Sequence, residues 1–199
     1  METNNNYPEI TMNTANDYLT TKKAVGKFLG LGTILCLLGA IILTTTQLLL
    51  RDAQAVTLNK PNDLFIIGLV AMLIFLVAGV VLFIHGARLE SPYEYIKKPF
   101  IMNSDVKKRL QNDWDVIKSN NRIVLIVGIC LCALSPISTI IGALSRDEDR
   151  FALGFGVCST LIIVAIAVYL IISAANILDA HNKLLEIENY SPEKKKARQ

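Results

Sequence analysis

Charge is the scarcest feature of this sequence. Of its 199 residues only 19% are Asp, Glu, Lys or Arg, whereas a soluble domain carries about a quarter. The apolar share is 52%, and the mean hydropathy is +0.44. A net charge of +3 is too small for a nucleic-acid-binding protein, and two histidines are too few for most metal enzymes. The composition therefore argues against both classes and favours a protein embedded in a membrane.

Four long stretches contain no Asp, Glu, Lys or Arg at all. Their lengths are 23, 24, 23 and 28 residues, and an α-helix needs about 20 apolar residues to cross the hydrocarbon core of a bilayer. Their apolar residues do not alternate with polar ones, as the strands of a membrane barrel require. We therefore predict an all-α, polytopic membrane protein with four transmembrane helices. The predicted helices are residues 28–50, 64–87, 123–145 and 151–178.

Basic residues are distributed unevenly around these helices. Sixteen Lys and Arg residues precede, separate or follow the two helix pairs, and four lie in the short loops inside the pairs. Because Lys and Arg are retained on the cytoplasmic side, we predict a multi-pass plasma-membrane protein with both termini and the middle loop in the cytoplasm. The first apolar run is too long for a signal sequence, although Ala53-Gln54-Ala55 imitates a cleavage site. The predicted units are a segment 1–27, a hairpin 28–87, a loop 88–122, a hairpin 123–178 and a basic tail 179–199.

The second half of the chain repeats the first. At a spacing of 96 residues there are ten identities in 33 positions, and the second helix of each half matches at a spacing of 88. The most specific match is an Asn-Asp-aromatic-x-x-x-Lys motif at 16–22 and 112–118, outside the apolar stretches. Two units that both enter from the same side are parallel repeats, related by an axis along the membrane normal. We predict two tandem parallel hairpins in a pseudo-symmetric four-helix bundle, whose first lead-in, the less apolar one, frays.

Residues 104–118 predict a cytoplasmic amphipathic helix in front of the third span. Ser104 is the expected N-cap and Asp105 the expected acidic residue of the first turn. A basic amphipathic helix with a Trp either lies in the lipid headgroup layer or packs beneath the bundle, and both alternatives stay open. Its candidate contacts with the membrane surface or with a cytoplasmic partner protein are the apolar stripe Val106, Leu110, Trp114 and Ile117 and the basic Lys107, Lys108 and Arg109.

Residues suited to catalysis or metal binding are few. No charged residue lies within the predicted spans, which argues against pumps and proton-coupled transporters. His85 and His181 could form a metal-binding or pH-sensing pair if their helix ends meet, but unpartnered interfacial residues are commoner. The cysteines are interpreted as small apolar fillers of helix contacts. They are Cys36, Cys130, Cys132 and Cys158. We predict no enzymatic activity, no cofactor and no metal.

A proline divides the third predicted span. Ser135-Pro136 is a candidate hinge, because proline removes a backbone donor and frees a carbonyl one turn earlier, near Cys132. Hydroxyl and amide residues accumulate around it, at 44–47 and at 138–139. These residues indicate either interhelical hydrogen bonds or a pocket for a ligand or peptide.

Two short patterns carry a family resemblance. A Leu-Cys-x-Leu-[Ser/Gly]-[Pro/Ala]-Ile pattern occurs at 35–41 and 131–137, and Tyr-Glu-Tyr-Ile follows the second helix at 93–96. Over roughly residues 14–187 the chain resembles the four-helix membrane region found in, or apart from, bacterial helix-turn-helix (XRE-type) transcriptional regulators. The resemblance does not extend to a DNA-binding domain, because the polar segment before the first lead-in is too short for one.

The function predicted from these patterns is non-enzymatic. It is a membrane anchor or sensor-like regulatory module that acts through a cytoplasmic partner, bound through the 88–122 loop, or through self-association. The alternative is a small transport or immunity-type component, either an oligomeric permease or a protector. Its expected partners are the lipid bilayer, a cytoplasmic protein and a second copy of the chain, and no nucleic acid.

Overall fold

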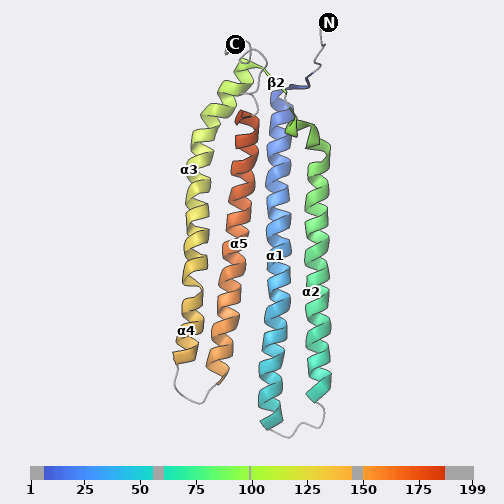
Figure 1. Cartoon of the computed structure of the whole chain (residues 1–199), viewed down its shortest axis with the longest axis vertical. Helices are drawn as coiled ribbons and strands as arrows, with labels where there is room; N and C mark the ends of the chain where they lie inside the picture. The colour runs from blue at the N-terminus through green and yellow to red at the C-terminus, as the bar shows by residue number, and fades with distance from the viewer. Residues whose placement is uncertain (1–6, 56–60, 99, 145–149, 187–199) are drawn as a thin grey trace, which may run out of the picture.

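Long helices make up nearly all of the part of the chain that the computed structural model describes (Figure 1). The structure describes residues 7–55, 61–98, 100–144 and 150–186. Lys60 and Arg146 of the hairpin loops, and the basic tail beyond Glu186, lie outside the described residues. The helices are α1 (Met12–Ala55), α2 (Pro61–Glu90), the 3-10 helix η1 (Ser91–Lys97), α3 (Ser104–Leu134), α4 (Pro136–Leu144) and α5 (Arg150–Glu186).

Among the described residues, four helical segments are long and apolar enough to cross a membrane, which confirms the predicted all-α fold at that level. They are α1, α2, α5 and the combined α3 and α4. The helices run well past the charge-free stretches at one end of the molecule. We call this the polar end, and it carries the start of α1, the end of α2, η1, the start of α3 and the end of α5 (Figure 1).

The predicted lead-ins are the first turns of the long helices rather than separate elements. α1 is continuous from Met12, and the expected fraying of its first turns stays a prediction. α3 is likewise continuous from Ser104 into the third span. The expected N-cap Ser104 is wrong, because Asn103 caps α3 and its side chain accepts a hydrogen bond from the backbone N–H of Asp105 at 3.2 Å. Asn is as good an N-cap as Ser, and here it occupies the extended position that a cap requires.

A two-residue strand precedes each of these helices. β1 (Glu9–Ile10) and β2 (Ile101–Met102) pair in parallel, with Ile10 opposite Met102. Ile10 and Met102 are buried. Strands this short have no detectable alternation, so the sequence did not indicate them. The pair joins the beginnings of the two halves at the polar end.

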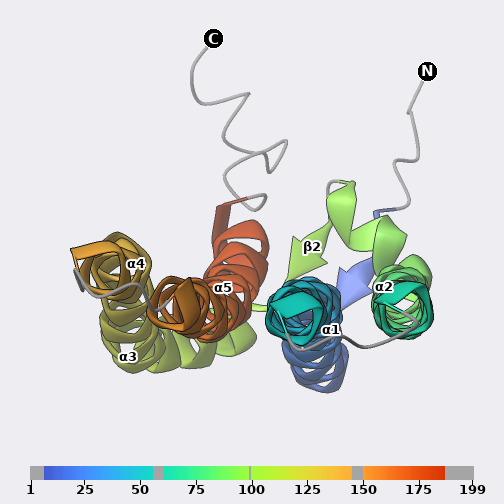
Figure 2. The ribbon, with the colours of Figure 1, turned by 90° about the horizontal axis from the view of Figure 1, so that it is seen from below.

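The helices form a row rather than the closed bundle that the repeat predicted. Seen end on, the order is α2, α1, α5 and then α3 with α4 (Figure 2). Among the described residues α2 has no extended contact with α3 or α5. Many large apolar side chains are therefore exposed, such as Ile67 (64%) and Ile74 (61%) on α2. Water is a poor solvent for so large an apolar surface, whereas lipid is a good one.

Small residues allow the two helices of each hairpin to approach closely. A Cβ added to Gly32 of α1 would lie 2.9 Å from the carbonyl oxygen of Gly79 in α2. In the second hairpin a Cβ added to Gly128 of α3 would lie 3.1 Å from the carbonyl oxygen of Ala167 in α5. Small residues at such crossings are typical of helix packing in membranes, where dispersion contacts replace the hydrophobic effect.

Candidate functional site

The buried core of the protein lies at the polar end. Its largest fully buried side chains come from β1, η1, α3 and α5, and they are Ile10, Ile96, Leu110 and Leu184. Tyr18 and Ala15 of α1 belong to the same cluster. The helix ends are therefore packed together as in a small soluble domain, next to a row of helices that is much less buried.

A buried ion pair joins the first hairpin within this region. Nζ of Lys22 lies 2.6 Å from Oε1 of Glu90, and the two side chains are 4% and 27% exposed. The ammonium group also lies 5.9 Å from the ring centroid of Tyr18. The sequence identified Lys22 as a cytoplasmic charge and as the lysine of the repeated motif, and neither pattern indicated Glu90 as its partner.

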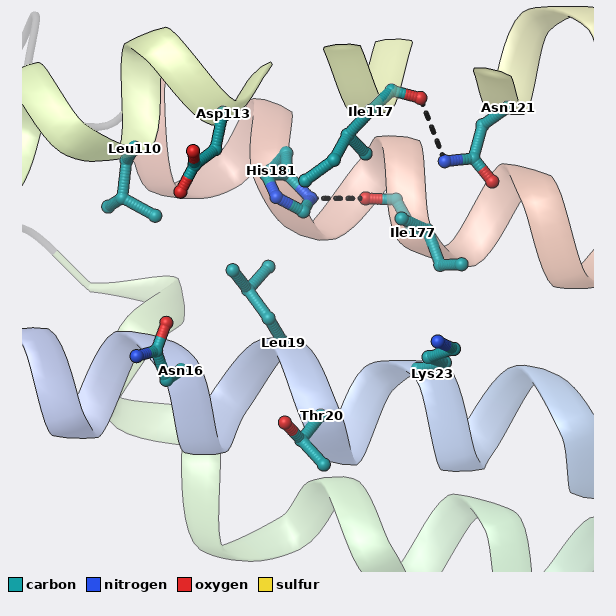
Figure 3. A pocket seen from close by; sticks show the side chains of 10 residues that line it. All are labelled: Asn16, Leu19, Thr20, Lys23, Leu110, Asp113, Ile117, Asn121, Ile177 and His181. Atoms are coloured by element: carbon teal, nitrogen blue, oxygen red, sulfur yellow. Dashed lines mark hydrogen bonds between the residues drawn. The ribbon is translucent and has the colours of Figure 1, made fainter.

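A pocket of about 290 Å³ lies between α1, α3 and α5 at the polar end (Figure 3). Its wall is partly apolar and partly polar. The residues that line it are Asn16, Leu19, Thr20, Lys23, Leu110, Asp113, Ile117, Asn121, Ile177 and His181. The pocket thus takes side chains from the first hairpin and from both helices of the second.

His181 is the most unusual residue of the pocket. Its Nδ1 donates a hydrogen bond to the carbonyl oxygen of Ile177 at 3.0 Å, and its ring stacks on Trp114 with the centroids 5.4 Å apart. The residue is 4% exposed, and its Nε2 is buried without a hydrogen-bond partner among the described residues. Buried polar atoms are nearly always paired, so an unpaired one calls for an explanation.

The protonation state of His181 follows from its surroundings. The residue lies beyond residue 178, outside the charge-free stretch, between the charged Asp179 and Lys183. Burial lowers the pKa of the imidazole from its ordinary value of 6.5, and this effect outweighs the hydrogen bond to Ile177 and the charge of Asp113, both of which raise it. The ring is therefore neutral at pH 7. Because Nδ1 carries the proton, Nε2 is a bare acceptor.

The apolar stripe predicted for residues 104–118 packs against the rest of the protein. Leu110 is buried in the core, Val106 packs against that core, Trp114 stacks on His181, and Ile117 lines the pocket. Of the basic residues, Lys108 and Arg109 are exposed and Lys107 is partly buried. Contact of the basic side with lipid or a partner protein stays a prediction.

The structure does not bring the two histidines together. His85 of α2 is exposed and meets Phe28 of α1 edge to face, with ring centroids 4.9 Å apart. In the row of helices, α1 separates α2 from α5 and its His181 (Figure 2). In the part of the chain that the structure describes, no three His, Cys, Asp or Glu side chains are grouped as metal ligands. All four cysteines are free thiols.

The helix breaks at the candidate hinge. α3 ends at Leu134, and α4 begins at Pro136. The Ser135 hydroxyl donates to the carbonyl oxygen of Cys132 at 2.8 Å, which satisfies the acceptor that the proline leaves free. From α5, the Thr160 hydroxyl donates to the carbonyl oxygen of Ser135 at 2.9 Å. These contacts correspond to the interhelical hydrogen bonds that were one of the two predicted alternatives.

No protein-family model matches this chain, and no match was found among curated proteins or solved structures. The fold itself defines the class, a predominantly helical protein whose described residues include four helices that are long and apolar enough to span a bilayer. The packed polar end and its pocket are the features from which a function can be argued.

Proposed function

We propose that this protein is a non-enzymatic, sensor-like regulatory module of the plasma membrane. The observation that carries the proposal is the pocket at the polar end, where a buried acceptor atom of His181 has no partner among the described residues. α1 contributes one wall of the pocket, and α3 and α5 contribute the other. A bound molecule would therefore change the position of the two hairpins relative to each other. A cytoplasmic partner or a second copy would respond to that placement.

A duplicated architecture supports this proposal. Tyr18 packs against Tyr93 with ring centroids 5.7 Å apart, as Trp114 packs against His181 at 5.4 Å. The first members of these pairs differ by 96 positions and the second members by 88, the two spacings of the sequence repeat. We infer that both pairs descend from one contact in a single ancestral hairpin, and that His181 replaced an aromatic partner in the second copy.

The lysines of the repeated motif show the same correspondence. Lys22 lies 5.9 Å from the ring centroid of Tyr18, and Lys118 lies 5.7 Å from that of Trp114. Lys22 is buried in an ion pair, whereas Lys118 is exposed. Under this proposal the first hairpin keeps a structural role at the polar end, and the second provides the acceptor of the pocket.

A partner on the cytoplasmic side fits this arrangement. The predicted orientation exposes the polar end to the cytoplasm, where Lys108 and Arg109 are accessible on α3. The resemblance to membrane regions of transcriptional regulators supports a role in signalling. Val106, Leu110 and Trp114 of the apolar stripe pack within the protein, so the exposed basic residues are the better candidates for contact with a partner.

A transport role is the alternative, and the hydroxyl groups near Pro136 are the observation that favours it. A transporter needs a polar, water-accessible lane through the spans. The Thr160 hydroxyl, however, lies 2.6 Å from that of Ser138 and 2.7 Å from that of Thr139. Because these groups satisfy one another between α4 and α5, they need no water in this arrangement.

Thiol labelling distinguishes the two functions. In a protein that keeps only Cys132, we expect a charged, membrane-impermeant maleimide to leave the thiol unmodified, because maleimides react with thiolates in water. A cysteine-free protein carrying Ser119→Cys, at an exposed position nearer the polar end, is the positive control. Rapid labelling of Cys132 in membranes opened on both sides would contradict the regulatory function and favour transport.

A further inference from the structure

The polar-end pocket presents two hydrogen-bond acceptors to an occupant. Nε2 of His181 has no partner among the described residues, and the Asp113 carboxylate lies on the side of the ring that carries Nε2 (Figure 3). A neutral imidazole nitrogen and a carboxylate can both only accept. A primary ammonium group complements them, because it supplies three N–H donors and a positive charge.

The pocket also has a cationic side. Lys23 is exposed on α1, and α1 and α3 both run from the polar end toward their charge-free stretches. Lys23 and Asn121 therefore lie nearer to these stretches than Asp113 does (Figure 3). An occupant that matches this order carries an anionic group on its membrane side and an ammonium group farther out.

The membrane-side edge of the pocket, at Lys23, corresponds in depth to the lipid headgroup layer, and Asp113 lies farther out, ten positions before Ile123. Lys23 precedes the first charge-free residue, Phe28, by five positions, which is about 8 Å along a helix. The headgroup region on each side of the hydrocarbon core is about 5–8 Å thick. Apolar side chains complete the wall and can contact the methylene groups of a headgroup and glycerol. They are Leu19, Ile117 and Ile177.

We infer that the pocket binds the zwitterionic headgroup of an aminophospholipid of the ethanolamine type. The phosphate pairs with Lys23, and the ammonium group donates to Nε2 of His181 and to the Asp113 carboxylate. A choline headgroup has the same charges but no N–H donor, so it leaves Nε2 unpaired. A glycerol headgroup has no cation for Asp113. Free phosphoethanolamine shares the chemistry of the ethanolamine lipid but would arrive from the cytoplasm.

Native mass spectrometry of the full-length protein tests this inference. The protein is purified in micelles with equal amounts of phosphatidylethanolamine, phosphatidylcholine and phosphatidylglycerol that carry identical acyl chains. We expect one phosphatidylethanolamine per chain, retained about tenfold over either competitor, which corresponds to about 1.4 kcal/mol. Asp113→Asn and His181→Phe should reduce this preference to parity. Asp115→Asn, on the same helix, and His85→Phe are the matched controls and should keep it.

His181→Phe alters a buried position and can therefore disturb folding. A second variant at the exposed Lys23 avoids this difficulty. Lys23→Gln should lower retention of phosphatidylethanolamine without changing the emission of Trp114, the single tryptophan of the chain. Equal retention of the three lipids by the unmodified protein, or an equal loss in the control variants, would overturn the inference. Binding of free phosphoethanolamine at the lipid's affinity would overturn the assignment to a lipid.

The inference deepens the proposed function by naming what the pocket senses, and it rests on that proposal only for the consequence of binding. Labelling of Cys132 tests regulation against transport without any lipid titration. A labelled Cys132 together with selective lipid retention would refute the function and keep the binding site. An unlabelled Cys132 with no lipid preference would refute the site and keep the function.

Discussion

Removing the carboxylate of Glu90 is expected to destabilise the protein by about 3–5 kcal/mol, the usual cost of leaving one member of a buried ion pair without its partner. In Glu90→Ala the Lys22 side chain, which is only 4% exposed, would be left without its partner carboxylate. Reversible unfolding in mixed micelles, followed by helical circular dichroism, measures this free energy of unfolding.

Two controls separate burial from charge. Lys183 and Asp179 form an exposed pair 2.7 Å apart, and Lys183→Ala should cost the protein at most about 1 kcal/mol, because water screens this pair. The double variant Lys22→Met with Glu90→Leu should regain most of the stability lost in Glu90→Ala, because apolar residues can replace a buried pair. A loss below about 1 kcal/mol in Glu90→Ala would show that the pair is not buried as described.

The second large effect is expected at the helix crossing of the first hairpin. A Cβ at Gly79 would lie 2.5 Å from Sγ of Cys36 and 2.7 Å from the carbonyl oxygen of Gly32. The backbone oxygen cannot move without shifting α1, so Gly79→Ala should cost about 1–3 kcal/mol through overpacking. The same unfolding measurement applies.

Gly86 is the matched control, because it lies on the same helix and faces α1. Its added Cβ would come no closer than 3.3 Å to the Cβ of Phe28. Gly86→Ala should therefore be nearly neutral, and the higher helix propensity of Ala works in its favour. Equal effects at the two glycines would contradict the close crossing of α1 and α2.

The sequence predicts most features that are set by residues within a single helix, such as the apolar spans and the helix break. The lack of charge in four stretches predicts the apolar helices, because a single charge near the centre of a span is costly in lipid. The break at Pro136 and the free acceptor at Cys132 also follow from one residue, because proline lacks the donor that a helix needs. The break appears in the structure, and the Cys132 carbonyl that proline leaves without its backbone donor accepts a hydrogen bond from the Ser135 hydroxyl instead.

Features that depend on contacts between distant segments were not predicted. The Lys22–Glu90 pair depends on the packing of α1 against α2, which brings together residues 68 positions apart, and no pattern along either helix indicates this partner. The row of helices was missed because a membrane helix can satisfy its apolar surface with lipid on any side. Hydropathy alone therefore does not distinguish a closed four-helix bundle from a row of helices.

The pocket was predicted only in part from the sequence. The repeated motif placed Asn16 and Asp113 in equivalent lead-ins. It did not predict that they would line one cavity. His181 was considered only as a partner of His85. The alignment at a spacing of 88 puts His181 opposite Tyr93, and this correspondence could have indicated a contact with Trp114 from the sequence.

The account depends most on four helices crossing a bilayer with the polar end in the cytoplasm. Single cysteines at Ser104, at the polar end, and at Thr57, between the first two charge-free stretches, test it in intact cells with an impermeant maleimide. We predict that Thr57→Cys is labelled from outside and that Ser104→Cys is labelled only after the membrane is permeabilised. Labelling of Ser104→Cys in intact cells would contradict the orientation. A protein that remains in the supernatant after ultracentrifugation without detergent would contradict the membrane assignment itself.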